Sequence, residues 1–231
     1  KFQPNIEEIL EQIDDKTKAI VMTNTHYVSG VRLNDNILDN LIREAEKKGY
    51  YLFFDESFHD PFKAKEIKPI ASLSKNGIST YTLTKMYGLS TLRFGLIAAN
   101  EELMRSIFTT QVNSSGLLNK EWKKVFDNID FYVKRSKKIR ETNFSLLKEF
   151  FDKKGIEYIT PDSGTTCAFK IGVNPKEFFE YSINKFGLKI GYQEQFGDVM
   201  FIAFGSEPKK FKKSLKVFDR ALDSYISKVF K

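Results

Sequence analysis

Apolar positions recur with a helical period in two segments near the start of the chain. The first segment covers residues 5–14, with Asn5 in the position of an N-cap, and its apolar residues are Ile6, Ile9, Leu10 and Ile13. The second segment ends at Gly49, a residue type that commonly closes helices, and its apolar residues are Ile37, Leu38, Leu41, Ile42 and Ala45. Both patterns predict amphipathic helices with one buried face.

Short apolar runs alternate with these helices and predict buried strands. The runs cover residues 19–23, 51–54, 78–83 and 94–99. Strand, helix and strand joined by short connections are typical of βαβ units in a mostly parallel sheet. The first part of the chain is therefore predicted to have an α/β fold.

The pattern changes in the second half of the chain. Residues 119–153 are predicted to form one long helix that runs to Gly155. Beyond it, short strands are predicted at residues 156–160, 166–171, 188–191 and 199–204, and helices at 175–186 and 207–230. We therefore divide the chain into a large-domain portion (1–118), a long interdomain helix (119–155) and a small α+β domain (156–231).

The composition excludes several classes of protein. The chain has 231 residues, of which 41% are hydrophobic and 29% charged, so it can form a packed core. No apolar run approaches the roughly 20 residues that a membrane-spanning helix needs, and no apolar signal segment follows the first five residues. One cysteine, Cys167, fits a reducing compartment, and with two histidines it supports no metal site. We expect a cytoplasmic protein with no membrane partner.

The net charge of +7 raises the question of a nucleic-acid partner. The lysines are spread along predicted helix faces, as in residues 44–48 and 134–138, and no zinc-finger, RNP or arginine-rich stretch accompanies them. Such faces are usually solvated surface. A basic nucleic-acid binder is therefore the weakest of the functional hypotheses.

Polar residues follow three of the predicted strands, at the edge where open α/β sheets bind ligands. Asp55 lies at the end of one strand, Thr82 and Lys85 lie at the end of the next, and Arg93 lies eight residues after Lys85. These groups suit pyridoxal phosphate, which has a carbonyl, a ring nitrogen and a phosphate. Lys85 would form the Schiff base, Asp55 would partner the ring nitrogen, and Thr82 and Arg93 would hold the phosphate.

Three stretches resemble class I/II aminotransferases, which are fold-type I pyridoxal phosphate enzymes. The run TLTKMYGLSTLRFG, residues 82–95, is similar to the family's Ser-x-Ser-Lys…Gly-Leu…Leu-Arg-x-Gly stretch. Residues 55–58 fall where the family has Asp-Glu-x-Tyr, and residues 23–30 where it has Asn-Pro-x-Asn-Pro-Thr-Gly. The resemblance runs through the whole chain, which lacks the family's N-terminal part.

The resemblance implies a three-layer large domain with a mostly parallel sheet, followed by a small C-terminal domain. It implies amino-group transfer between a small amino donor and a keto acceptor, with Lys85 as the catalytic residue that also moves the proton at the substrate Cα. It also implies a homodimer. The missing N-terminal part is the one that supplies a phosphate-binding loop and an aromatic ring stacked on the cofactor.

Three departures from the family pattern bear on substrate and cofactor. The family asparagine and tyrosine that hydrogen-bond the cofactor's ring hydroxyl are replaced by Tyr27 and Phe58. Tyr27 either takes over this bond or points to solvent or to the substrate side. The arginine that binds the substrate α-carboxylate aligns with Phe201, and no arginine occurs between Arg140 and Arg220. The ordinary carboxylate clamp is therefore absent from this position.

Two other functions stay open at this point. A pyridoxal phosphate lyase or decarboxylase on the same scaffold would tolerate the loss of the carboxylate arginine. A regulatory domain with the same fold could bind the cofactor without turnover. Turnover of an amino donor with a keto-acid acceptor would distinguish the aminotransferase from both.

Overall fold

The computed structural model describes residues 2–63, 66–92, 94–110 and 120–229. The chain folds into two compact units. The first consists of Lys1–Tyr27, Val31–Lys134 and Asp162–Gly164, and the second of Val28–Gly30, Arg135–Pro161 and Thr165–Lys231. Each unit has its own sheet and is described by itself.

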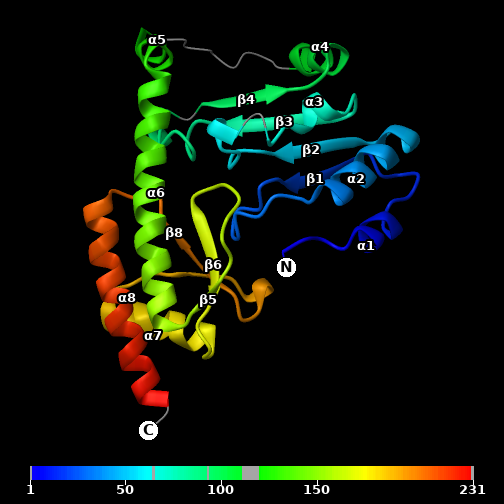
Figure 1. The fold of residues 1–231 in the computed structure, drawn as a ribbon. Coiled ribbons are helices and arrows are strands. Elements are labelled where there is room, and N and C mark those ends of the chain that lie inside the picture. Colours follow the sequence, from blue (N-terminus) through cyan, green and yellow to red (C-terminus); the bar gives the residue numbers. More distant parts are fainter. Residues whose placement is uncertain (1, 64–65, 93, 111–119, 230–231) are drawn as a thin grey trace. The chain divides into compact units, whose positions relative to one another are not determined.

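The first unit is built on a four-stranded sheet in the order β1-β2-β3-β4 (Figure 1). Strands β1 (Ala19–Thr23), β2 (Tyr51–Asp55) and β3 (Gly77–Thr82) are parallel, and β4 (Gly95–Ala98) is antiparallel to β3. All four predicted strands are confirmed within one or two residues. The mostly parallel sheet that the βαβ pattern predicts is also confirmed.

Helices precede, connect and follow these strands. They are α1 (Ile6–Glu11), α2 (Asp35–Lys48), the short α3 (Ile70–Leu73), α4 (Glu101–Thr110), α5 (Lys120–Asp127) and the 3-10 turns η1 (Pro61–Lys63) and η2 (Ser90–Leu92). The Asn34 side chain caps α2 by accepting from the Ile37 N–H at 2.9 Å. Gly49 ends α2 at φ +80°, a backbone conformation that favours glycine.

The alternation of side chains along the strands gives the sheet two different faces. Ile20, Met22, Leu52 and Phe54 point to one face, where they join a core with residues of α1, α2 and α3. On the other face, Val21 is 72% exposed. In parallel sheets both faces are ordinarily covered by other elements. Here the described residues cover one face, and the face that carries Val21 is left exposed.

The predicted single helix over residues 119–153 is wrong in one respect. The structure has two helices, α5 and α6 (Ile129–Lys154), separated at Asn128; residue 119 lies outside the described residues. The Asn128 side-chain amide donates to the Lys124 carbonyl oxygen at 2.8 Å. Asparagine side chains compete in this way with the backbone ladder, and this explains the break.

The second unit packs helices on an antiparallel sheet in the order β5-β6-β8-β7. Its elements are the Arg135–Lys154 part of α6, β5 (Glu157–Tyr158), β6 (Thr166–Lys170), α7 (Pro175–Phe186), β7 (Gly191–Tyr192), η3 (Glu194–Phe196), β8 (Met200–Ala203) and α8 (Pro208–Val229). Phe151, Phe169, Phe178 and Phe218 form an aromatic centre of its core. The α+β character predicted for this part is confirmed.

Phe201 lies on β8 opposite Gly191 of β7. A Cβ atom at Gly191 would come within 2.4 Å of the Phe201 ring, so the ring lies directly against the glycine backbone. Phe201 therefore packs within the second unit as an apolar residue.

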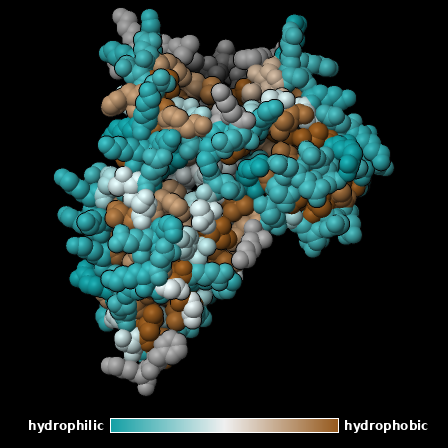
Figure 2. All heavy atoms as spheres, in the orientation of Figure 1, coloured by the Kyte–Doolittle hydropathy of each residue, from teal (hydrophilic) through white to brown (hydrophobic). Residues whose placement is uncertain are grey.

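The surface is rich in polar and charged residues. Figure 2 shows a face on which hydrophilic residues predominate and hydrophobic residues gather in scattered patches. Within the described residues, every helix is either too short or too polar to cross a lipid bilayer.

Gly77 offers a test of the packing between α3 and β3. A Cβ at this position would lie 2.3 Å from the carbonyl oxygen of Ile70 and 2.7 Å from the carbonyl carbon of Ile70. Both are backbone atoms that cannot rotate away. We expect Gly77→Ala to lower the free energy of unfolding by at least about 2 kcal/mol. Urea denaturation followed by circular dichroism measures the loss.

Gly95→Ala on β4 is the matched control for this substitution. Its added Cβ would lie 3.8 Å from the Tyr81 carbonyl oxygen, an ordinary van der Waals contact. An equal loss in the two variants would contradict the steric explanation.

Candidate functional site

The candidate site lies at the carboxyl edge of the parallel strands of the first unit. Thr23 of β1 is in register with Asp55 of β2, and Asp55 is in register with Thr80 of β3. Two backbone hydrogen bonds continue the ladder beyond the strand ends. The Asn24 N–H donates to the backbone carbonyl oxygen of Asp55 at 3.0 Å, and the Glu56 N–H donates to the backbone carbonyl oxygen of Thr80 at 2.9 Å. The residues that follow β1, β2 and β3 therefore leave the sheet at the same edge.

Asp55 is half-buried, and its carboxylate is held by Ser57. The Ser57 backbone N–H donates to Asp55 Oδ1 at 2.9 Å and the Ser57 hydroxyl donates to the same oxygen at 2.5 Å. Neighbouring residues along a strand point to opposite faces, so Asp55 and Glu56 point in opposite directions. Asp55 lies on the sheet face that carries Val21.

Glu56 is 2% exposed and lies on the side of α3. Its Oε1 accepts the Ile70 N–H at 2.8 Å, and it is also hydrogen-bonded to the Ser79 hydroxyl. Burial raises the pKa of Glu56 to about 7, against the opposing effect of these two hydrogen bonds. Glu56 thus links the segment after β2 to the start of α3.

His59 is buried in the same segment, at 8% exposure. Its backbone carbonyl accepts the Tyr81 hydroxyl at 2.9 Å, and its ring is hydrogen-bonded to the Asn24 backbone. Burial lowers the pKa of His59 to about 4, so the imidazole is neutral near pH 7. From the sequence, His59 is interpreted either as a substrate contact or as a loop histidine without a catalytic role, and the second interpretation is favoured. Its burial depends on contacts between three strand ends.

Lys85 lies on the turn after β3, and its side chain is exposed. Its Nζ is 5.6 Å from the centroid of the Phe58 ring, in a cation–π arrangement. No carboxylate within the described residues forms an ion pair with it. Lys85 and Asp55 thus come from neighbouring strands without neutralising each other.

The Thr82 hydroxyl closes the turn that carries Lys85. It donates to the Phe94 carbonyl oxygen at 2.9 Å, lies 3.0 Å from the Thr84 hydroxyl and accepts the Thr84 N–H at 3.2 Å. These bonds fix the turn to the start of β4. Arg93, the other predicted phosphate ligand, lies outside the described residues.

Tyr27 lies on the loop that follows β1 and is half-buried. Its ring is 5.3 Å from the His26 ring, centroid to centroid, at an interplanar angle of 50°. The loop is closed by a bond from the His26 N–H to the Val31 carbonyl oxygen at 2.9 Å. Tyr27 therefore belongs to the same sheet edge as Asp55.

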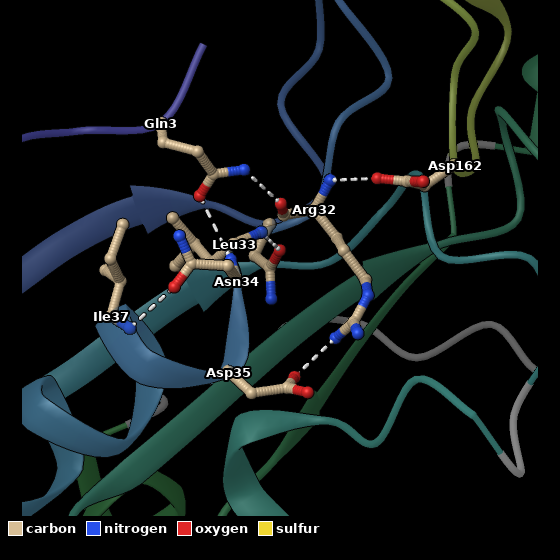
Figure 3. Close-up of polar contacts among 8 residues, drawn as sticks. Gln3, Arg32, Leu33, Asn34, Asp35, Ile37 and Asp162 are labelled. Atoms are coloured by element: carbon tan, nitrogen blue, oxygen red, sulfur yellow. Dashed lines mark hydrogen bonds and ion pairs between the residues drawn. The ribbon is translucent and has the colours of Figure 1, made fainter. Parts of the chain in front are cut away.

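The backbone beyond this loop is held by side chains that are distant in sequence (Figure 3). The Gln3 amide donates to the Arg32 carbonyl oxygen at 2.7 Å and accepts the Asn34 N–H at 3.0 Å. The Arg32 N–H donates to Asp162 Oδ2 at 3.1 Å. The start of the chain and the Asp162–Gly164 loop thus support the same segment of the first unit.

The Asp162–Gly164 loop also reaches Phe58. The Ser163 hydroxyl donates to the Phe58 carbonyl oxygen at 2.5 Å, and Lys63 Nζ donates to the Asp162 carbonyl oxygen at 2.6 Å. Sequence reasoning misses these contacts because about a hundred residues separate the partners. It also misses Ser57, although a serine two residues after an aspartate is a recognisable turn signal.

The groups at this edge fit pyridoxal phosphate. Asp55 Oδ2 has no hydrogen-bond donor among the described residues, and the Lys85 ammonium has no carboxylate partner there. An acceptor and an amine left unpaired at one sheet edge suit a ligand with a ring N–H and a carbonyl.

Comparison with known proteins identifies the family of the chain. The model of the family "Aminotransferase class I and II" matches residues 1–197. An aspartate aminotransferase of Thermotoga maritima is 24% identical over 191 residues, which are 78% of this chain and 48% of that protein. A histidinol-phosphate aminotransferase of Flavobacterium johnsoniae is 26% identical over 74% of this chain and 48% of its own length. The chain thus spans about half the length of these curated relatives.

A solved structure shares the fold. The crystal structure of a PLP-dependent aminotransferase from Streptococcus suis superposes with a TM-score of 0.82 at 21% identity, covering 96% of this chain and 61% of that one. The α/β unit with a mostly parallel sheet and the separate α+β unit are therefore those of the pyridoxal phosphate-dependent transferase fold.

Glu56 gives the edge a pH-dependent stability. Folding raises its pKa from 4.5 to about 7, so its contribution to stability is present below pH 4.5 and is lost as the pH rises through 7. Glu56→Gln keeps the oxygen that accepts the Ile70 N–H and removes the charge. We expect it to raise the free energy of unfolding at pH 8 by on the order of 2 kcal/mol and to change it little at pH 4.5. Urea denaturation at both pH values measures the difference.

Glu46→Gln is the control for the charge effect. Glu46 is an exposed glutamate whose Oε1 accepts the Ser74 hydroxyl at 2.9 Å. This variant should keep the pH dependence of the wild type. If Glu56→Gln gave the same gain at pH 4.5 as at pH 8, ionisation of Glu56 would not be the cause.

Proposed function

The chain belongs to the aminotransferase class I and II family, and we propose that it is part of a pyridoxal phosphate-dependent aminotransferase that binds the cofactor covalently through Lys85. The family and its aspartate aminotransferase members are pyridoxal phosphate-dependent. The observation that carries the proposal is the placement of Asp55 and Lys85 on adjacent parallel strand ends without an ion pair between them. The reactants are a small amino donor and a keto acceptor.

Bound pyridoxal phosphate supplies an electron sink for the bond that breaks at the substrate Cα. Asp55 accepts a hydrogen bond from the protonated ring nitrogen and so keeps the proton there. With the cofactor bound, the Lys85 amine would take the proton from the substrate Cα and deliver it to the C4′ carbon of the cofactor. The exposure of Lys85 leaves room for this movement.

The remaining ligands are assigned by the same resemblance. Thr82 and Arg93 hold the phosphate, and Thr82 does so by giving its proton to a phosphate oxygen in place of the Phe94 carbonyl. Tyr27 donates to the ring hydroxyl of the cofactor, a role that Phe58 cannot fill. The protein acts as a homodimer in the cytoplasm. A lyase or decarboxylase is the second candidate, because Phe201 replaces the carboxylate-binding arginine.

Covalent binding through Lys85 is testable by reduction. Borohydride treatment of the protein with pyridoxal phosphate should fix the cofactor on one peptide, which mass spectrometry should map to Lys85. Lys85→Ala should lose the adduct. Lys68→Ala, which removes an exposed lysine of the same unit, should keep it. An adduct that maps elsewhere in the wild type would refute the assignment.

The substrate preference follows from Phe201. Its ring packs against Gly191 and offers no charge, and a buried carboxylate that loses its ion-pair partner costs several kcal/mol. We expect kcat/KM for aspartate and glutamate, which carry an α-carboxylate, to be at least about a hundredfold below that for amines or amino alcohols, which have none. Steady-state assays with a keto-acid acceptor measure it. Efficient aspartate transamination would contradict the role given to Phe201.

A further inference from the structure

The Asp55 carboxylate has one occupied oxygen and one open oxygen. Both hydrogen bonds that it accepts go to Oδ1, from the backbone N–H and the hydroxyl of Ser57, at 2.9 Å and 2.5 Å. Oδ2 has no donor within the part of the chain that the structure describes. The two oxygens are therefore not equivalent.

Ser57 is suited to hold this asymmetry. It is 7% exposed, so water competes little for its hydroxyl. A serine hydroxyl has one proton, and this proton is given to Asp55. The backbone around it is also fixed, because the preceding residue donates to Thr80 and its side chain binds the start of α3. The donor thus stands on a rigid segment.

Two donors on one carboxylate oxygen restrict rotation about the Cβ–Cγ bond. The open oxygen then has a defined position, and an approaching N–H donor meets an acceptor that needs no reorientation. Building on the proposed function, we infer that Ser57 is a positioning residue that orients Asp55 so that Oδ2 receives the protonated ring nitrogen of the cofactor. Ser57 itself touches neither the cofactor nor the substrate in this role.

The local turn alone does not explain the hydroxyl. The bond from the backbone N–H of residue 57 to Oδ1 would form with any residue except proline at this position, as it does in other turns that begin with aspartate. Ser57→Ala keeps this bond and removes only the hydroxyl. The substitution therefore separates the positioning role from the turn.

The test compares two ligands on the full chain. One is pyridoxal phosphate, and the other is its 1-deaza analogue, in which a C–H replaces the ring nitrogen and no hydrogen bond to Asp55 can form. Equilibrium binding is followed by protein fluorescence. We expect Ser57→Ala to weaken pyridoxal phosphate about tenfold and the analogue less than about twofold.

Three further variants complete the series. Ser57→Thr retains a hydroxyl and should restore binding of pyridoxal phosphate to within about threefold of the wild type. Ser57→Cys keeps the size of the side chain with a weaker donor, should lie between serine and alanine, and serves if the alanine variant does not fold. Ser72→Ala removes an exposed hydroxyl that donates to the Pro69 carbonyl oxygen, and should change neither affinity.

The outcomes are distinct. Equal weakening of the two ligands by Ser57→Ala, or no weakening of either, would overturn the positioning role while leaving the Lys85 adduct in place. Failure of the wild type to form the Lys85 adduct would refute the proposed function before any variant is compared, and the role of Ser57 with it. Selective weakening of pyridoxal phosphate supports the inference.

Discussion

The parallel register of β1, β2 and β3 determines where each candidate residue of the site lies. Thr23, Asp55 and Thr80 are aligned across the sheet, and backbone hydrogen bonds extend the ladder to Asn24 and Glu56. A shift of one residue in β2 would turn Asp55 to the face that α1, α2 and α3 cover. The apolar pattern prevents such a shift, because it would also bring the Leu52 and Phe54 side chains out of the core.

The same alternation gives two consecutive acids different environments. Glu56 is enclosed beside α3, where burial raises its pKa to about 7 and two donors anchor it. Asp55 is half-buried on the opposite face, and Ser57 supplies its donors. One acid thus connects the sheet to a helix, and the other keeps an open oxygen at the edge. Strand geometry thus gives two consecutive residues different burial and different hydrogen-bond partners.

Local signals predict much of this fold, whereas tertiary contacts escape them. The strands, the closure of α2 at Gly49 and the common edge of Asp55, Thr82 and Lys85 follow from periodicity and short connections. The break at Asn128 depends on a polar side chain that binds the preceding helix α5, and apolar periodicity carries no information about such a bond. The burial of His59 depends on strand ends that meet only in the folded chain.

Phe58 gives the Lys85 ammonium a contact at this edge that is not an ion pair. The Lys85 ammonium lies 5.6 Å from the Phe58 ring centroid, and such a contact at an exposed site contributes about 0.5–1 kcal/mol. The Ser163 hydroxyl holds the Phe58 carbonyl and so fixes the backbone on which the ring stands. An aromatic face attracts the ammonium but offers it no proton acceptor of its own. The amine is therefore held at this edge by a weak contact, without a carboxylate partner among the described residues.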